Sequence, residues 1–153
     1  MSKGETSDLL KFLEPFNQEI QDIAMWLRDF VWDLYPQANE LIYDNYNAVA
    51  FGWSPSDKLG EVFCSIAAGS NKYVHFGFYW GSKIVDPEKK LLGKGNQYRY
   101  ITVKTQADFP IEYMKKLIQE AYVYSVSIMK DPGQTLSGAT IVKSISAKKK
   151  RPE

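Results

Sequence analysis

Three consecutive segments of the chain alternate apolar residues with smaller or more polar ones, and only short connections join them. The segments are residues 46–53, 61–68 and 73–80, and a fourth follows at residues 98–104. A period of two places successive side chains on opposite faces of a β-strand. Because parallel neighbours need a crossover of about a dozen residues or more, connections as short as residues 69–72 require antiparallel neighbours. The sequence therefore predicts an antiparallel β-sheet of four to five strands.

Two longer segments have the period of helices that bury one face. Apolar side chains recur at spacings of three and four in residues 16–34 and again in residues 111–129. Pro36 ends the first segment, because proline lacks the backbone N–H that would continue a helix. We also predict short helices within residues 1–14 and at residues 37–45. With N-terminal and C-terminal helices packed on one face of the sheet, the predicted fold class is α+β.

The length of 153 residues is that of one domain. We place the domain at residues 1–133 and interpret residues 134–153 as an extension. Its polybasic end, residues 148–151, is typical of a disordered, solubilising tail, although such a run also suits contact with nucleic acid or an acidic partner. The composition does not otherwise favour nucleic-acid binding.

Cysteine usage and hydropathy indicate the compartment. The single cysteine, Cys64, excludes an internal disulfide and fits a reducing environment. The N-terminal residues lack a basic segment followed by an apolar run, and no apolar run approaches the roughly 18 residues of a membrane span. We expect a cytoplasmic protein that does not contact a membrane.

The net charge of +1 conceals an asymmetry between the two halves of the chain. Residues 1–61 carry 11 acidic and 4 basic side chains, whereas residues 62–153 carry 7 acidic and 15 basic ones. Such halves can lie against each other in one molecule or present opposed binding faces. The pattern is compatible with a homodimer, and it identifies neither a protein partner nor an interface.

One face of the first long helix is acidic. Glu19, Asp22, Asp29 and Asp33 fall at helical spacings, with Trp26 among them. A solvated helix face is the ordinary explanation. The alternative is a site for a hard or borderline cation such as iron, because carboxylate oxygens suit such ions.

Motifs of known enzymes are mostly missing, and we expect no catalytic activity. Cys64 lies within an apolar strand, as a buried hydrophobe would. His75, the single histidine, has no carboxylate or nucleophile tied to it by spacing. The Gly93-Lys94-Gly95-Asn96 segment opens into a strand rather than a helix, so it does not have the context of a phosphate-binding loop.

Three stretches of the sequence carry a resemblance to a known family. They are PQANELIYDNYNAVAF at residues 36–51, FGFYWGSKIVDPEKKLLGKGNQYRYITV at residues 76–103, and KKLIQEA at residues 115–121. Residues 36–121 thereby resemble the YdhG-like family of domains of unknown function. The positions that match the family pattern are Glu40, Tyr43, Phe78, Gly81, Asp86, Pro87, Leu91, Leu92, Gly93, Gly95 and Arg99. The family commonly has lysine at the position of Asn96 and histidine at that of Tyr100.

The resemblance implies a small α+β domain without an established catalytic activity. Some relatives are described as frataxin-like iron carriers, which implies the same role for the acidic helix face here. Our first interpretation is a non-enzymatic binding or interaction domain whose ligand is unknown, with iron as the alternative cargo and no other cofactor.

We expect the functional surface to lie at the sheet edge and the glycine loop. The candidate ligand-binding residues there are Glu40, Tyr79, Lys94, Arg99 and Tyr100. Irregular segments on a rigid scaffold are where binding residues concentrate. An equal alternative gives Arg99 a structural role, paired with Glu40 or Asp86 to hold the loop in place.

Overall fold

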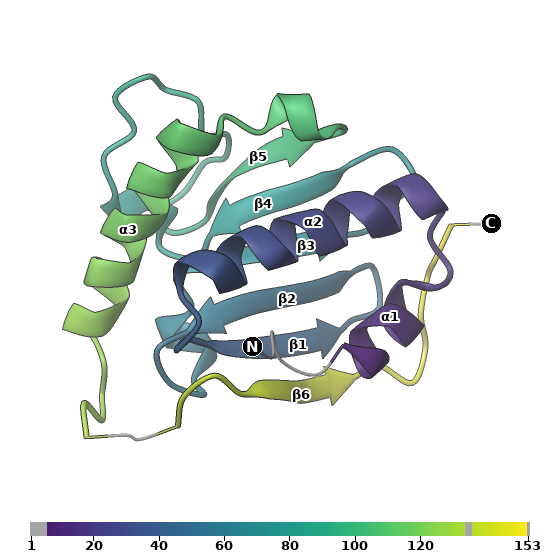
Figure 1. Cartoon of the computed structure of the whole chain (residues 1–153), viewed down its shortest axis with the longest axis horizontal. Helices are drawn as coiled ribbons and strands as arrows, with labels where there is room; N and C mark the ends of the chain where they lie inside the picture. The colour runs from purple at the N-terminus through teal and green to yellow at the C-terminus, as the bar shows by residue number, and fades with distance from the viewer. Residues whose placement is uncertain (1–5, 134–135, 153) are drawn as a thin grey trace.

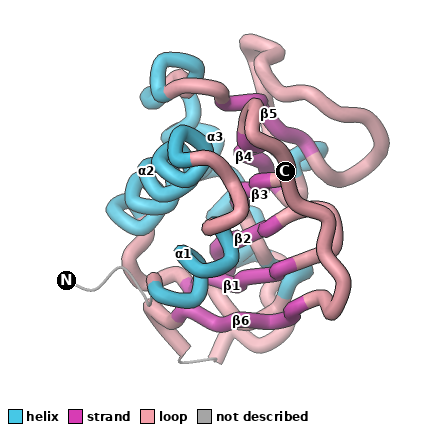
Figure 2. Tube along the Cα trace, turned by 90° about the vertical axis from the view of Figure 1, so that its right-hand side faces the viewer, coloured by secondary structure: helices cyan, strands magenta, loops and turns pink. Residues whose placement is uncertain are grey.

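The computed structural model describes residues 6–133 and 136–152. Helices cover one face of a single six-stranded sheet (Figures 1 and 2), as predicted for an α+β fold. The helices are α1 (Ser7–Leu13), α2 (Gln18–Leu34) and α3 (Ile111–Ser127). The strands are β1 (Asn39–Asp44), β2 (Val49–Ser54), β3 (Cys64–Ala68), β4 (Val74–Phe78), β5 (Arg99–Val103) and β6 (Thr140–Ile145). No helix in the described part of the chain combines the length and the apolar character that a membrane crossing requires.

The strands lie in the order β5-β4-β3-β2-β1-β6. The four alternating segments of the sequence form β2 to β5, and each pairs with its chain neighbour in antiparallel fashion. β1 pairs antiparallel with β2 and parallel with β6. The sheet therefore contains the predicted antiparallel meander and one parallel pair that the sequence did not indicate.

The prediction of a short helix at residues 37–45 is wrong, because this segment contains β1. Ile42 is fully buried beneath the helices, Leu41 is fully buried on the opposite face, and the strand is paired on both edges. Its neighbour β2 follows after a short turn, which holds β1 in the ladder. Tertiary pairing outweighs the weak helical preference of a segment only six residues long.

α2 buries an apolar stripe against the sheet. Its first turn is capped by Asn17, whose side-chain oxygen accepts a hydrogen bond of 3.0 Å from the backbone N–H of Ile20. The stripe that follows includes Ala24, Leu27 and Val31, each fully buried. The helix ends at Leu34, before Pro36, as the sequence predicts.

A buried ion pair joins α2 to β1. The Arg28 guanidinium donates to both carboxylate oxygens of Glu40, at 2.7 and 2.6 Å, and both side chains are fully buried. Thr140 of β6 donates a further hydrogen bond of 3.0 Å to Glu40. A buried carboxylate needs such partners, because an unpaired charge in the interior is strongly destabilising.

The C-terminal segment is part of the domain. β6 extends the sheet beside β1, and beyond it Lys149 and Arg151 form ion pairs with Asp44, which is fully buried. The Arg151 guanidinium also donates to the backbone carbonyl of Tyr46. These contacts correct two expectations: residues 136–152 belong to the sheet domain, and the polybasic end at residues 148–151 is held against it. Residues 134, 135 and 153 lie outside the described part of the chain.

Candidate functional site

The face of the sheet opposite the helices carries a hollow. Small residues of β2 and β3 form its floor. The residues of these strands that line the hollow from this face are Ala50, Gly52, Ser65 and Ala67. The hollow is a cavity of about 360 Å³. Side chains from β1 and from the segments that flank β3, β4 and β5 make the walls. They include Tyr43, Asn45, Leu59, Val62, Tyr79, Gln97 and Tyr98.

The Tyr98 ring lies over Gly77, which has no side chain to displace it. A Cβ added at Gly77 would lie 2.2 Å from the Tyr98 hydroxyl and 2.4 Å from the ring, so only glycine leaves room for this ring. Burial, reinforced by neighbouring Tyr100, raises the pKa of Tyr98 to about 12, although a hydrogen bond with Ser65 acts in the opposite direction. The Tyr98 wall of the hollow is therefore neutral near pH 7.

The other two tyrosines line the hollow from β1 and from the segment after β4. Tyr43 lies directly opposite Ala50 in the β1–β2 pair, and Tyr79 packs edge-on against Trp80. Burial raises the pKa of Tyr43, and Tyr79 beside it contributes in the same direction. Three phenol rings therefore surround a floor of small side chains.

A row of stacked rings continues from this hollow along β4 and β5. Tyr98 stacks on Tyr100 with ring centroids 5.7 Å apart, Tyr100 lies 4.3 Å from His75, and His75 stacks on Tyr73 at 5.1 Å. Burial lowers the pKa of His75, which favours its neutral form. The row makes an aromatic margin for the small residues of β2 and β3.

Arg99 has the structural role that we considered, but with different partners. Its guanidinium donates to the backbone carbonyls of Gly95 and Tyr98, each at 2.8 Å, and to that of Lys94 at 3.4 Å. Gly93 and Gly95 have positive φ angles of 119° and 91°, which glycine adopts without strain. The loop before β5 is thus closed by Arg99 through carbonyl oxygens rather than through Glu40 or Asp86.

Asp86 organises the preceding part of the same loop. Its carboxylate accepts hydrogen bonds from the backbone N–H groups of Lys90 and Leu91 and from the Tyr113 hydroxyl of α3. Burial alone would raise the pKa of Asp86, but these hydrogen bonds outweigh it and lower the pKa. The Asp-Pro and Gly-x-Gly parts of the sequence therefore fold the loop and tie it to α3.

The predicted ligand-binding residues do not meet at one place. Tyr79 lines the hollow, and Tyr100 lies in the stacked row beside it. Lys94 lies in the loop, and Arg99 is the first residue of β5. Glu40 lies on the helix-covered side, where Arg28 and Thr140 bind its carboxylate, which corrects its expected position near the loop.

The four acidic residues of α2 lie on its exposed face. Glu19, Asp22, Asp29 and Asp33 are all exposed, and Asp22 accepts a hydrogen bond of 2.8 Å from Gln18. Within residues 6–133 and 136–152, no three His, Cys, Asp or Glu side chains are placed to hold a metal ion. Trp26 is turned to the core, against Phe109.

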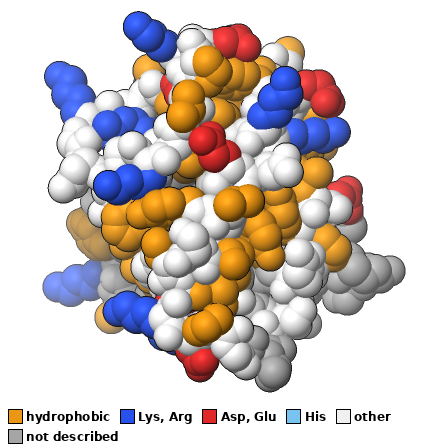
Figure 3. All heavy atoms as spheres, turned by 90° about the vertical axis from the view of Figure 1, so that its left-hand side faces the viewer, with side chains coloured by type: hydrophobic (Ala, Val, Ile, Leu, Met, Phe, Trp, Pro, Cys, Tyr) orange, Lys and Arg blue, Asp and Glu red, His pale blue; other side chains and the backbone are white. Residues whose placement is uncertain are grey.

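A second apolar surface lies on the α3 side of the molecule. Figure 3 shows hydrophobic side chains spread over this side, between separate charged ones. Val123 and Val126 of α3 are exposed there, and Trp80 packs against Tyr124 while donating to the carbonyl of Gly60. This surface is convex helix and loop, whereas the hollow encloses space that a ligand can occupy.

No protein-family model matches the sequence, and the searches of curated proteins and of solved structures likewise return no match. The resemblance to the YdhG-like family consequently stays a prediction.

The floor of the hollow was not predicted from the sequence. The signal was present: in residues 48–53 and 64–68 the positions that alternate with the more strongly buried ones are small, namely Ala48, Ala50, Gly52, Ser65 and Ala67. When two adjacent strands have small residues on the same uncovered face, the surface there must be recessed. Register was the missing information, because it decides whether those positions lie side by side.

Proposed function

We propose that this protein is a non-enzymatic binding domain that takes a small, planar, largely apolar ligand into the hollow between Tyr43, Tyr79 and Tyr98. The observation that carries the proposal is a 360 Å³ cavity with a floor of small side chains and three tyrosine walls on the sheet face opposite the helices. Small-molecule sites are typically concave, mostly apolar and supplied with a few polar groups, and this volume is within their range.

The chemistry of the lining supports a planar ligand. Aromatic walls offer stacking and edge-on contacts to a ring, each of about 0.5–1.5 kcal/mol beyond the burial of its area. Asn45 and Gln97 supply amide groups at the margin, which would orient a ligand more than hold it. The Tyr98 phenol remains neutral, so its face is available to an uncharged ring.

A fluorescence titration with the neutral dye N-phenylnaphthylamine tests the proposal. We expect saturable enhancement with the wild-type protein and a loss of affinity of about tenfold or more in Ala50→Phe, because the new ring fills the floor of the hollow. Ala147→Phe adds the same ring at an exposed position outside it and should bind as wild type does. Equal binding by all three proteins would refute the proposal, provided that their melting temperatures agree.

The iron-carrier alternative receives no support from the described residues, and it stays a prediction. Anaerobic titration with iron(II), followed by Trp26 fluorescence, tests it directly. A saturable change at micromolar iron that Asp22→Asn and Asp29→Asn abolish would support it; its absence would remove it.

A further inference from the structure

The hollow continues along the open face of the sheet. Next to it lies a shallow depression of about 210 Å³ that shares Ala67 with it and also contacts His75 and Tyr73. Beyond the depression is a cleft of about 520 Å³, which shares Gly69 and Ser70 with the depression. Shared lining residues connect the three spaces into one groove that runs from the open face to the end of the sheet, where Asn71 contacts the start of α2 and Arg151 contacts Asp44.

β3 sets the length of this groove. Ser65 lines the hollow, Ala67 lines both the hollow and the depression, and Gly69 lines both the depression and the cleft. Because a strand rises about 3.3 Å per residue, the four steps from Ser65 to Gly69 span about 13 Å. A ligand that reaches from one end to the other must be elongated.

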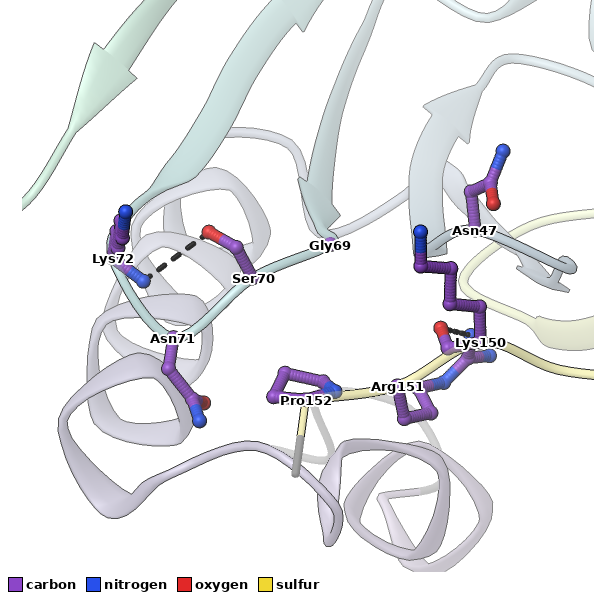
Figure 4. A pocket seen from close by; sticks show the side chains of 8 residues that line it. All are labelled: Asn47, Gly69, Ser70, Asn71, Lys72, Lys150, Arg151 and Pro152. Carbon is purple, nitrogen blue, oxygen red and sulfur yellow. Dashed lines mark hydrogen bonds between the residues drawn. The ribbon is translucent and has the colours of Figure 1, made fainter.

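The far end of the groove is cationic. The turn that contains Lys72 lines one side of the cleft, and the C-terminal segment with Lys150 lies across from it (Figure 4). The eight residues lining the cleft include no carboxylate. The third cation there, Arg151, is already paired with Asp44.

Lys72 and Lys150 have no comparable partner. Among the described residues, neither ammonium group makes a hydrogen bond or an ion pair. Asn47 and Ser70 add polar side chains beside them. Lysine side chains on opposite sides of one cleft are complementary to an anionic group, since charge-assisted hydrogen bonds are the stronger ones.

We propose that the groove binds an elongated ligand with an apolar or aromatic body and an anionic end group, the body in the tyrosine hollow and the carboxylate or phosphate at Lys72 and Lys150. This inference rests on the proposed function of the hollow and adds the second recognition element. The stacked rings of Tyr73 and His75 border the path between the two ends.

Dansylaminoundecanoic acid is a suitable probe, because a flexible chain joins its aromatic group to a carboxylate. Its methyl ester keeps the length and the ring and removes the charge. We expect the acid to bind about fivefold or more tightly than the ester, and Lys72→Gln/Lys150→Gln to remove that difference while leaving the ester's affinity unchanged. The matched control Lys116→Gln/Lys130→Gln makes the same change of net charge on and after α3 and should preserve the preference.

The outcomes separate this inference from the proposed function. Equal binding of acid and ester, or a preference that persists after both lysines are neutralised, overturns the anionic end group while the hollow still stands. Failure of acid, ester and N-phenylnaphthylamine alike overturns both. A preference lost equally in the control pair would show a general effect of net charge and would also overturn the inference.

Discussion

The two faces of the sheet are built from alternate residues of the same strands, and they differ in side-chain size. On the helix-covered face, β2 contributes Phe51 and Trp53, both fully buried. On the open face the same strand contributes Ala50 and Gly52, which form the floor of the hollow. One face stabilises the fold by burying large side chains, and the other leaves space. A single strand thus contributes to the core and to the candidate site in alternation.

The largest expected effect comes from truncating the covered face. Phe51→Ala should lower the free energy of unfolding by about 3–5 kcal/mol, the usual cost of replacing a buried phenylalanine with alanine. Chemical denaturation measures it. Its neighbour on the open face provides the comparison, since Ala50→Phe should change stability by less than about 1 kcal/mol while blocking dye binding. Equal destabilisation by both substitutions would contradict the division between the faces.

The buried ion pair gives the next effect. Glu40→Gln should lower the free energy of unfolding by about 3 kcal/mol, because it leaves the Arg28 charge in the interior without its carboxylate partner. Replacing both residues, as in Arg28→Met/Glu40→Leu, should destabilise less than the single change. Glu112→Gln removes the partner of Lys115 in an exposed pair and should cost well under 1 kcal/mol. A Glu40 variant as stable as this control would show that the pair is not isolated from solvent.

Gly77→Ala tests the open face directly. The new methyl group would lie 2.2 Å from the Tyr98 hydroxyl, so the ring must move, at a cost of about 1–3 kcal/mol. We expect Tyr98 to ionise at a lower pH in the variant, because displacement exposes its phenol, and ultraviolet titration of tyrosinate reports this. An unchanged tyrosine titration would mean that the ring does not depend on Gly77 for its position.

The smallest expected effect concerns pH. Burial lowers the pKa of His75 below its ordinary value of 6.5, so the unfolded chain takes up a proton at a higher pH than the folded protein does. Stability that depends on neutral His75 is therefore present above pH 6.5 and is lost as pH falls below it. His75→Gln should show a flatter dependence between about pH 7 and pH 5.5 in thermal denaturation. Since the chain has one histidine, parallel curves for the two proteins would refute the assignment.

The sequence predicted the parts of the fold that local periodicity determines. The alternation in β2 to β5 and the apolar stripes of α2 and α3 identify these elements, and short turns establish antiparallel pairing. β1 pairs with β2 across a short turn, but it was missed because residues 37–45 were interpreted as a helix. β6 was missed because its partner strand is distant in the chain: Glu40 of β1 contacts Thr140 of β6, a hundred residues away. No local pattern reports such a pairing.

The candidate site was only partly predictable for a related reason. Tyr79 and Tyr100 were selected as aromatic residues beside an irregular loop, and they lie in or next to the hollow. Glu40 was selected because it was expected near this loop. Its partner in the interior, Arg28, lies on a helix whose apolar period gives no sign of an inward-facing charge. Which polar residues face inward depends on contacts between elements.

The floor of alanine, glycine and serine beneath the hollow also bears on how this protein can diversify. A Cβ added at Gly52 would lie 2.9 Å from Val62 and 3.1 Å from the Cys64 carbonyl oxygen, so this position must stay glycine. Ala50 and Ala67 point away from the core, so exchanging either for a slightly larger residue reshapes the hollow without repacking the helices. Selection can then act on ligand preference and on stability through different positions of the same two strands. Single amino-acid substitutions in such a sheet can therefore change which ligand the protein recognises while the fold stays intact.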